Sequence, residues 1–321
     1  MHVRTFLHLR QQRAVVSSSI RPERPYEFYR LWLGSSMVFS SAYFQTPEED
    51  LNHAQETGLE RICNKLQLTK TDRFLDLNCN WGSLLLHAGA FHETPSHGFS
   101  QSNEQLTTVE LRLVETGLTS RCAVHRGTYK DLQEVRVPFT KIASVGFTEL
   151  ALDVQHLDYF RSIYQKLSPG GLFLVDFVTR SSSPLDLEFE TGSGFAYRTL
   201  PKLSLILESV EKAGFVIANI EELRDQFEAT LRLWFSALAK HRHELSRMTC
   251  RRSVRAWELC LACAVESTRA GQISLYQILL RRPLEYSPQK EASAAASQAG
   301  GDLYPLPDSM PVRARRETGS W

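Results

Sequence analysis

Short apolar runs alternate with amphipathic segments through the middle of the chain. Five runs of apolar or small residues are typical of buried strands and span residues 73–77, 97–99, 122–125, 141–147 and 172–178. Helical spacing appears over residues 81–90, 103–115 and 157–167, and the last of these ends at a Ser-Pro-Gly-Gly turn, residues 168–171. Unbroken apolar strands joined by helices predict a doubly wound α/β sheet, in which ligands bind at the carboxyl ends of the strands.

The pattern changes after the fifth predicted strand. A helix over residues 203–213 and a strand over 215–220 precede two long amphipathic helices, 226–248 and 253–269. A last apolar strand covers residues 273–280. We expect the two long helices to form a cap and the last two strands to pair antiparallel at the sheet edge.

The two ends of the chain lack this periodicity. Residues 1–22 contain four arginines and no acidic residue, which fits a flexible basic N-terminus over residues 1–25 and also resembles an organelle transit peptide. Residues 285–321 are rich in Ala, Ser, Gln, Gly and isolated prolines, which predicts a disordered tail. The predicted domain therefore covers residues 26–284.

Composition narrows the class of partner. The net charge of +1 gives no overall attraction to nucleic acid. No stretch approaches the length of a spanning apolar helix, so we expect at most peripheral membrane contact. Of the six cysteines only Cys260 and Cys263 are closely spaced, and no second pair completes a zinc motif. We therefore expect no metal, reduced thiols, a cytoplasmic location and a small-molecule or lipid-like substrate, with a homodimer as one assembly.

The loop after the first predicted strand carries the candidate chemistry. It reads Asp-Leu-Asn-Cys-Asn-Trp-Gly-Ser over residues 76–83, where a strand turns into a helix and nucleotide cofactors bind. Asn78 and Asn80 stand where glycines are usual, and asparagine tolerates positive φ better than other non-glycine residues. The loop can turn, but two side chains now stand near the ligand. An α/β protein whose cofactor site has decayed is the alternative.

Several further segments share one resemblance. Phe-Tyr-Arg-Leu-Trp-Leu at residues 28–33, Phe-Ser-Ser-Ala-Tyr-Phe at 39–44, Leu-Arg-Leu-Trp at 231–234 and Arg-Ala-Gly-Gln-Ile at 269–273 follow in order. Together with Tyr276 and Gln277 they make residues 26–283 similar to the cyclopropane fatty acid and mycolic acid cyclopropane synthases. The resemblance implies a class I methyltransferase fold, a Rossmann-like seven-stranded sheet with its last strand antiparallel and a helical cap.

The resemblance also implies S-adenosylmethionine as cofactor and names its contacts. Ser40, Asp76, Gly82, Gln105 and Tyr129 match positions of the family, whereas Asn78 and Asn80 replace glycines and Ser100 replaces a threonine. Each also has a plainer interpretation: Ser40 and Ser100 as turn hydroxyls, Gln105 as a helix-capping side chain, and Tyr129 as ordinary aromatic packing.

The implied catalytic pocket departs further. The family holds bicarbonate as its base, at positions that read Ser41, Glu149, Asp176, Val178 and Cys260 in this chain. Only the glutamate is retained, and Asp176 adds a negative charge that should repel bicarbonate. In one interpretation Asp176 is itself the base, because two neighbouring carboxylates separate their pKa values. In the other, Asp176 is a solvated strand-end residue and the chemistry of the family is lost.

The implied activity is transfer of a methyl group to an alkene, with ring closure as one outcome. Acidic residues at 186, 188 and 190 make a phospholipid surface less favourable, so a lipid-like or isoprenoid substrate is expected. N-methylation of a small amine and a catalytically inactive methyltransferase-like protein are the two alternatives.

Overall fold

The fold is known over three stretches of the chain. The computed structural model describes residues 25–146, 156–181 and 200–284. The N-terminal segment up to residue 24, the predicted tail from 285 and the candidate residue Glu149 lie outside them.

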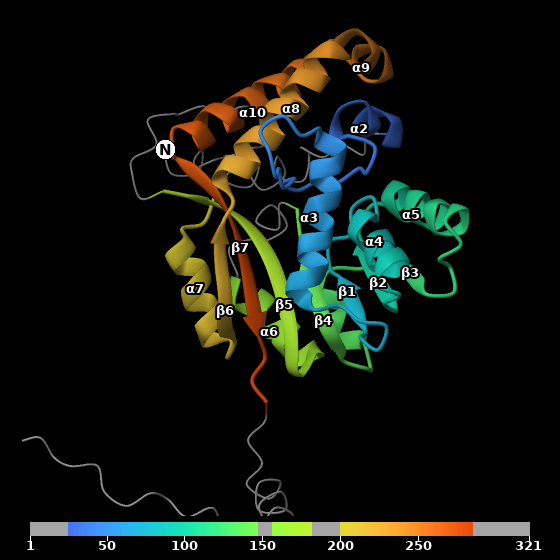
Figure 1. The fold of residues 1–321 in the computed structure, drawn as a ribbon, viewed down its shortest axis with the longest axis vertical. Helices are drawn as coiled ribbons and strands as arrows, with labels where there is room; N and C mark the ends of the chain where they lie inside the picture. Colours follow the sequence, from blue (N-terminus) through green and yellow to red (C-terminus); the bar gives the residue numbers. More distant parts are fainter. Residues whose placement is uncertain (1–24, 147–155, 182–199, 285–321) are drawn as a thin grey trace, which may run out of the picture. The chain divides into compact units, whose positions relative to one another are not determined.

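A seven-stranded sheet forms the centre of the domain, in the order β3–β2–β1–β4–β5–β7–β6 (Figure 1). Neighbouring strands among β1 to β5 pair in parallel, whereas β7 runs antiparallel between β5 and β6. The strands are β1 (Phe74–Asp76), β2 (Ser96–Ser100), β3 (Cys122–Arg126), β4 (Phe139–Ser144), β5 (Leu167–Arg180), β6 (Val216–Glu222) and β7 (Ile273–Arg281). The predicted α/β class I methyltransferase architecture and the antiparallel pairing of the last two strands are confirmed.

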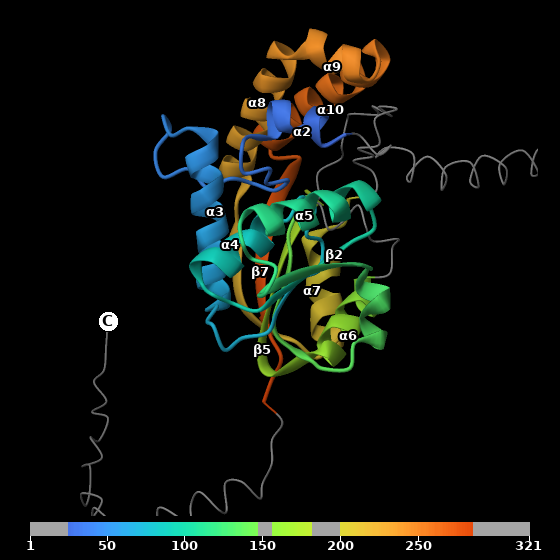
Figure 2. The ribbon, with the colours of Figure 1, turned by 90° about the vertical axis from the view of Figure 1, so that its right-hand side faces the viewer.

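Helices cover both faces of this sheet (Figures 1 and 2). One face carries α3 (Leu51–Leu66), α4 (Ser83–Phe91) and α5 (Asn103–Glu115); the other carries α6 (His156–Lys166), α7 (Leu203–Lys212) and the 3₁₀ helix η1 (Tyr129–Glu134). Because side chains alternate along a strand, Phe74 packs with α3 and α4 while Leu75 packs with α6 and α7. Burial on both faces explains why the strands read as unbroken apolar runs.

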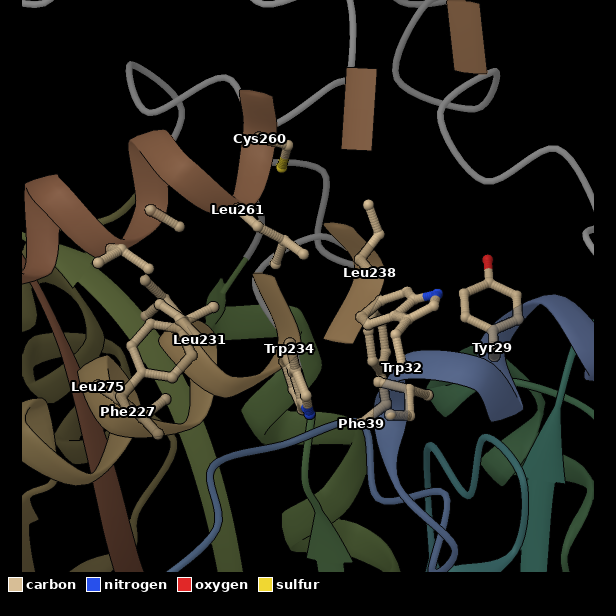
Figure 3. Packing of buried hydrophobic residues seen from close by; sticks show 14 of the residues in the cluster. Tyr29, Trp32, Phe39, Phe227, Leu231, Trp234, Leu238, Cys260, Leu261 and Leu275 are labelled. Carbon is tan, nitrogen blue, oxygen red and sulfur yellow. The ribbon is translucent and has the colours of Figure 1, made fainter. Parts of the chain in front are cut away.

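Four further helices gather at one end of the sheet, at the top of Figure 1. They are α2 (Tyr26–Leu33), α8 (Arg224–Lys240), α9 (Arg242–Met248) and α10 (Arg251–Arg269). Aromatic rings fill the space between them (Figure 3). The Trp234 ring stacks on Phe39 with centroids 5.7 Å apart and meets the edge of Trp32 at 5.9 Å. These contacts fix the segment that follows α2, which reaches the candidate site.

Two sequence predictions about element boundaries are wrong. The helix predicted over residues 226–248 is two helices, α8 and α9, separated at His241. Residues 240–244 carry no apolar side chain to hold a straight helix on the core, and the break lets Leu245 join the same buried cluster as Leu238.

The Ser-Pro-Gly-Gly segment is the second correction, because it belongs to β5 rather than to a free turn. The Gly170 N–H donates to the Arg282 carbonyl, and the Arg282 N–H donates to the Gly171 carbonyl. Gly170 adopts φ +77°, which its missing Cβ permits. Helices α2 and α3 were missed, although both bury apolar residues at helical spacing, such as Phe28 and Trp32 in α2 and Leu59, Ile62 and Leu66 in α3.

Replacing Trp234 by Ala should lower the free energy of unfolding by roughly 3–5 kcal/mol, the usual cost of emptying a buried aromatic site. Its indole N–H has no hydrogen-bond partner among the described residues, so the loss is one of packing. Urea titration would measure it, with the half-exposed Leu205→Ala as control. A change below about 1 kcal/mol would contradict this account of the cap.

Candidate cofactor and catalytic site

A cavity of about 280 Å³ lies at the carboxyl ends of β1 to β4. The strand order reverses there between β1 and β4, which is where doubly wound sheets bind their ligands. Its lining residues among the described part of the chain are Leu77, Asn78, Phe99, Ser100, Gln101, Gly127, Thr128, Tyr129, Lys130, Ser144 and Tyr159. The predicted cofactor residues Asn78, Ser100 and Tyr129 are therefore brought together.

The two asparagines of the loop bond to backbone. Asn80 adopts φ +48°, and its Nδ2 donates to the Asn78 carbonyl at 2.8 Å. Asn78 Nδ2 donates to the Gly146 carbonyl at 2.8 Å. Asn80 is buried and absent from the cavity lining, whereas Asn78 lines the cavity. Of the two asparagines, therefore, only Asn80 adopts positive φ and only Asn78 faces the cavity.

Gly82 ends the loop and caps α4 with φ +82°. A Cβ there would approach the Val109 side chain to 3.0 Å, so α5 packs closely against the start of α4. The predicted cofactor residue Gly82 therefore shapes the turn between the loop and α4. Gly82 does not line the cavity.

Polar and aromatic contacts shape the far side of the cavity. Ser100 Oγ donates to Gln105 Oε1 at 2.7 Å and accepts the Ser102 N–H at 3.2 Å. Gln105 therefore acts behind Ser100 in this structure. Tyr129 meets Tyr159 edge-on, with ring centroids 5.2 Å apart and planes at 76°. An aromatic wall of this kind suits the flat base of a nucleotide.

Asp76, the last residue of β1, has a buried carboxyl group. Its side chain is 2% exposed, and burial raises the pKa of its carboxyl to about 7, against the opposing bond from the Asn78 backbone N–H. Its Oδ1 has no hydrogen-bond partner among the described residues. A buried acceptor without a donor is costly, and Asp76 itself is not among the residues that line the cavity. The cavity and its aromatic wall fit a nucleoside cofactor such as S-adenosylmethionine.

The Phe39–Ser40 peptide connects this cavity to a second buried carboxyl. A Cβ on Gly146 would lie 2.5 Å from the Phe39 carbonyl, so only glycine allows this approach. The next residue, Ser40, donates its Oγ to Asp176 Oδ2 at 3.0 Å. Asn78, which lines the cavity, is thus linked to Asp176 through Gly146 and the Phe39–Ser40 peptide, none of which lines it.

Asp176 is held on both of its oxygens. Gln277 Nε2 donates to Asp176 Oδ1 at 3.0 Å, and Ser40 supplies the bond to Oδ2. The side chain is 2% exposed, so the interpretation of Asp176 as a solvated strand-end residue is wrong. Burial raises the pKa of its carboxyl to about 6, outweighing the two hydrogen bonds and the nearby Lys65 ammonium.

A row of polar side chains continues across the sheet from Asp176. Strand register places Gln277 opposite both Asp176 and Glu221. Lys65, from α3, donates to Gln277 Oε1 and to Glu221. Arg61 also pairs with Glu221 at 2.9 Å. Burial opposes ionisation of Glu221, but the Lys65 and Arg61 contacts lower the pKa of its carboxyl overall.

The other predicted catalytic residues pack in the apolar core, bond to backbone or lie outside the described chain. Val178 and Cys260 belong to the apolar core of the cap, with Cys260 on α10 near Leu261 (Figure 3). Ser41 Oγ donates to the carbonyl of the next residue, Ala42, at 2.9 Å. Glu149 is not described. Their proposed catalytic roles remain predictions.

Three polar residues beside the candidate site, Gln277, Lys65 and Lys130, have no role predicted from the sequence. Gln277 had one usable signal, a polar side chain inside an otherwise apolar strand. Lys65 had none, because a lysine near a helix end is ordinary. Lys130 lines the cavity and likewise reads as a surface charge from sequence.

A larger hollow of about 530 Å³ lies near the start of α8 and the end of α10. It contains none of the predicted site residues. Its charged groups bond one another, with Arg269 2.8 Å from Glu228 and Arg232 3.9 Å from the same carboxylate. We interpret it as a solvated ion-pair network.

Comparison with known proteins identifies the family. The family model described as mycolic acid cyclopropane synthetase matches residues 21–278. The chain belongs to this family. A probable fatty acid methyltransferase of Pseudomonas putida is 32% identical over 263 residues, covering 80% of this chain and 66% of the relative.

Other relatives extend the comparison. A probable fatty acid methyltransferase of Mycobacterium tuberculosis is 28% identical, covering 78% of this chain and 59% of its own length. This member of the mycolic acid cyclopropane synthetase family thus spans less than two thirds of these two relatives. The cyclopropane synthase MmaA2 from M. tuberculosis superposes with TM-score 0.74 at 24% identity, covering 80% of this chain and 94% of that one, which shows the shared fold.

The buried Asp76 carboxyl should make the ligand-free protein less stable as pH rises. Its pKa lies near 7 in the folded chain against a usual 3.8, so between these values the unfolded state binds fewer protons and the free energy of unfolding falls with rising pH. Asp76→Asn should remove a fall on the order of a few kcal/mol between pH 4 and pH 8. Urea titrations across this range would measure it, with the exposed Asp225→Asn as control. Parallel curves for wild type and Asp76→Asn would contradict the assignment.

Proposed function

We propose that this chain is an S-adenosylmethionine-dependent C-methyltransferase acting on an alkene of a lipid-like substrate. Family membership and relatives named as fatty acid methyltransferases support the reaction class. Further relatives named as a cyclopropane mycolic acid synthase and a sphingolipid C9-methyltransferase also act on lipids by name. A structural neighbour, CmaA1, is described in complex with SAH and CTAB, which supports the choice of cofactor.

The residues that would hold the cofactor are those of the cavity. Asn78, Ser100 and Tyr129 line it, and Asp76 precedes the lining residue Leu77, with an Oδ1 that no donor among the described residues reaches. When bound, S-adenosylmethionine supplies a methyl group on a sulfonium, whose loss leaves the positive charge on the substrate. Because the loop amides are bonded to backbone, they need not be displaced for the cavity to be used.

The observation that carries the proposal is the buried Asp176 carboxyl. Its pKa of about 6 leaves it mostly ionised at neutral pH yet basic enough to accept a proton, as a general base requires. After an alkene carbon has gained the methyl group, the cation loses a proton from that methyl to Asp176, and the electron pair of the broken C–H bond closes the ring. A carboxylate in this place makes the bicarbonate of the family unnecessary.

Ser40 and Gln277 position this base. Each donates to a different oxygen of Asp176, which favours the ionised form and fixes the plane of the carboxyl. Two lone-pair positions remain for a proton, because each carboxylate oxygen accepts more than one hydrogen bond.

Location and assembly follow as part of the same proposal. Among the described residues, no helix is long and apolar enough to cross a membrane. We propose that contact with lipid is peripheral, that the protein works in the cytoplasm, and that a homodimer is its assembly. Sedimentation of the full chain with and without vesicles would test the lipid contact and the homodimer.

Calorimetric titration with S-adenosylmethionine, followed by incubation with unsaturated lipids and methyl-labelled cofactor, tests the function. We expect saturable binding and transfer of label to the alkene, resolved by mass spectrometry. Absence of both heat and thermal shift at high cofactor concentration would instead indicate an inactive methyltransferase-like protein. Label found in small amines with alkenes unchanged would favour N-methylation.

Asp176→Asn should reduce turnover on the alkene by a factor on the order of 10²–10⁴, the usual contribution of a general base, while cofactor affinity stays within a few-fold. Asp225→Asn serves as the matched control, because this carboxylate is fully exposed on α8. Retained turnover that rises with added bicarbonate would show that Asp176 is not the base.

Lys65→Met should move the acidic limb of the pH–activity profile upward. The Lys65 charge lowers the pKa of Asp176, so its removal leaves the base protonated to higher pH. The profile of kcat/KM reports this shift in the free enzyme. Lys240→Met on α8 is the control, and an unchanged limb in Lys65→Met would argue that the polar row does not act on the base.

A further inference from the structure

Three metal-ligating side chains converge between α3 and α4, outside the site described above. Cys63 Sγ and one ring nitrogen each from His87 and His92 lie within 4.8 Å of one another. No metal is expected from the sequence, because no second pair accompanies Cys260 and Cys263. That expectation overlooks His87 and His92, which have four residues between them as in many zinc sites. The fold brings Cys63 to this pair.

The three residues approach from fixed positions. Cys63 is fully buried in the core between α3 and α4. His87 lies on α4, and His92 is the C-cap residue of the same helix. Their side chains are 11% and 15% exposed, so both imidazoles are packed in place with little freedom to turn away. Sulfur–nitrogen and nitrogen–nitrogen separations of about 3.3–3.6 Å follow from zinc bond lengths in a tetrahedral site, so a small inward movement closes the set.

Glu60 organises the two imidazoles. Its Oε2 lies 2.9 Å from His87 Nε2 and 3.0 Å from His92 Nε2. The bond from His87, helped by that from His92, lowers the pKa of the Glu60 carboxyl despite burial. A ring whose Nε2–H donates to a carboxylate carries its lone pair on Nδ1, the arrangement in which metal-bound histidines are usually found.

We propose that Cys63, His87 and His92 bind a divalent transition-metal ion of the zinc class, with Glu60 orienting both imidazoles. A thiolate with two imidazoles is a donor set that suits Zn²⁺ over Mg²⁺ or Ca²⁺. A water completes a tetrahedron, because Glu60 is engaged on the Nε2 side of both rings. Cys63 thereby gains a role that its burial in an apolar core would not require.

Binding must displace the proton of Cys63. Burial raises the pKa of this thiol well above its usual range, and a coordinated thiol is deprotonated by the ion itself. One proton therefore leaves for each ion bound, and affinity rises with pH. The ion would join α3 to α4, and hence the helix that carries Lys65 to the helix that follows the cofactor loop.

The test uses the full chain without an affinity tag, loaded with Zn²⁺ and dialysed against buffer. We expect about one zinc per chain by elemental analysis, retained against a weak chelator, and a Tm that rises with added zinc. Co²⁺ in place of zinc should give the thiolate-to-metal absorption band. Cys63→Ala should abolish the band and His92→Ala the stoichiometric zinc, while Cys122→Ala, an equally buried thiol, should change neither.

Glu60→Gln provides a variant that spares all three ligands. It should weaken zinc binding by about 10–100-fold with the far-ultraviolet circular dichroism unchanged. Wild-type protein that holds under about one tenth of an equivalent after dialysis, or a Co²⁺ band that survives in Cys63→Ala, would overturn the proposal. Because none of these measurements uses methyl transfer, the result is independent of the proposed function.

Discussion

One buried carboxylate, Asp176, joins the parts of the molecule that form the candidate site. Its two hydrogen bonds come from Ser40, on the segment after α2, and from Gln277, on the antiparallel strand β7. An isolated charge at this depth would cost many kcal/mol, so each donor is required for the fold as well as for any chemistry. The segment after α2 is thereby held between the cap and the sheet, next to the cavity.

The polar row behind Asp176 explains how the chain tolerates this burial. The buried Gln277 donates to Asp176, and its own Oε1 also needs a hydrogen-bond donor. Lys65 supplies that donor. Lys65 is in turn balanced by Glu221, which is only partly buried and reaches Arg61. Hydrogen bonds and ion pairs thus connect the buried Asp176, through Gln277 and Lys65, to the partly exposed Glu221. A network of this kind is stable only when every member is satisfied.

Sequence predicted most of the elements but little of this network. The helix Asn103–Glu115 has the predicted bounds, because a Ser102 cap and a regular apolar face mark it locally. The pairing of Asp176 with Gln277 depends on strand register between segments about a hundred residues apart, which no local pattern encodes. The same holds for Cys63 with His87 and His92. At Asn80 the sequence was informative, since its residue type predicted the positive φ that the loop adopts.

The two buried aspartates can be separated by what surrounds them. Asp76 has one backbone donor, and its Oδ1 has no hydrogen-bond partner within residues 25–146, 156–181 and 200–284, a partner that we propose a cofactor at the switch point of the sheet supplies. Asp176 has donors on both oxygens and keeps a lower pKa, near 6 rather than near 7. Asp76, which lacks a donor, suits ligand binding. Asp176, which is already hydrogen-bonded as an anion, suits proton transfer. We therefore propose that environment alone divides the roles of ligand binding and proton transfer between these chemically identical side chains.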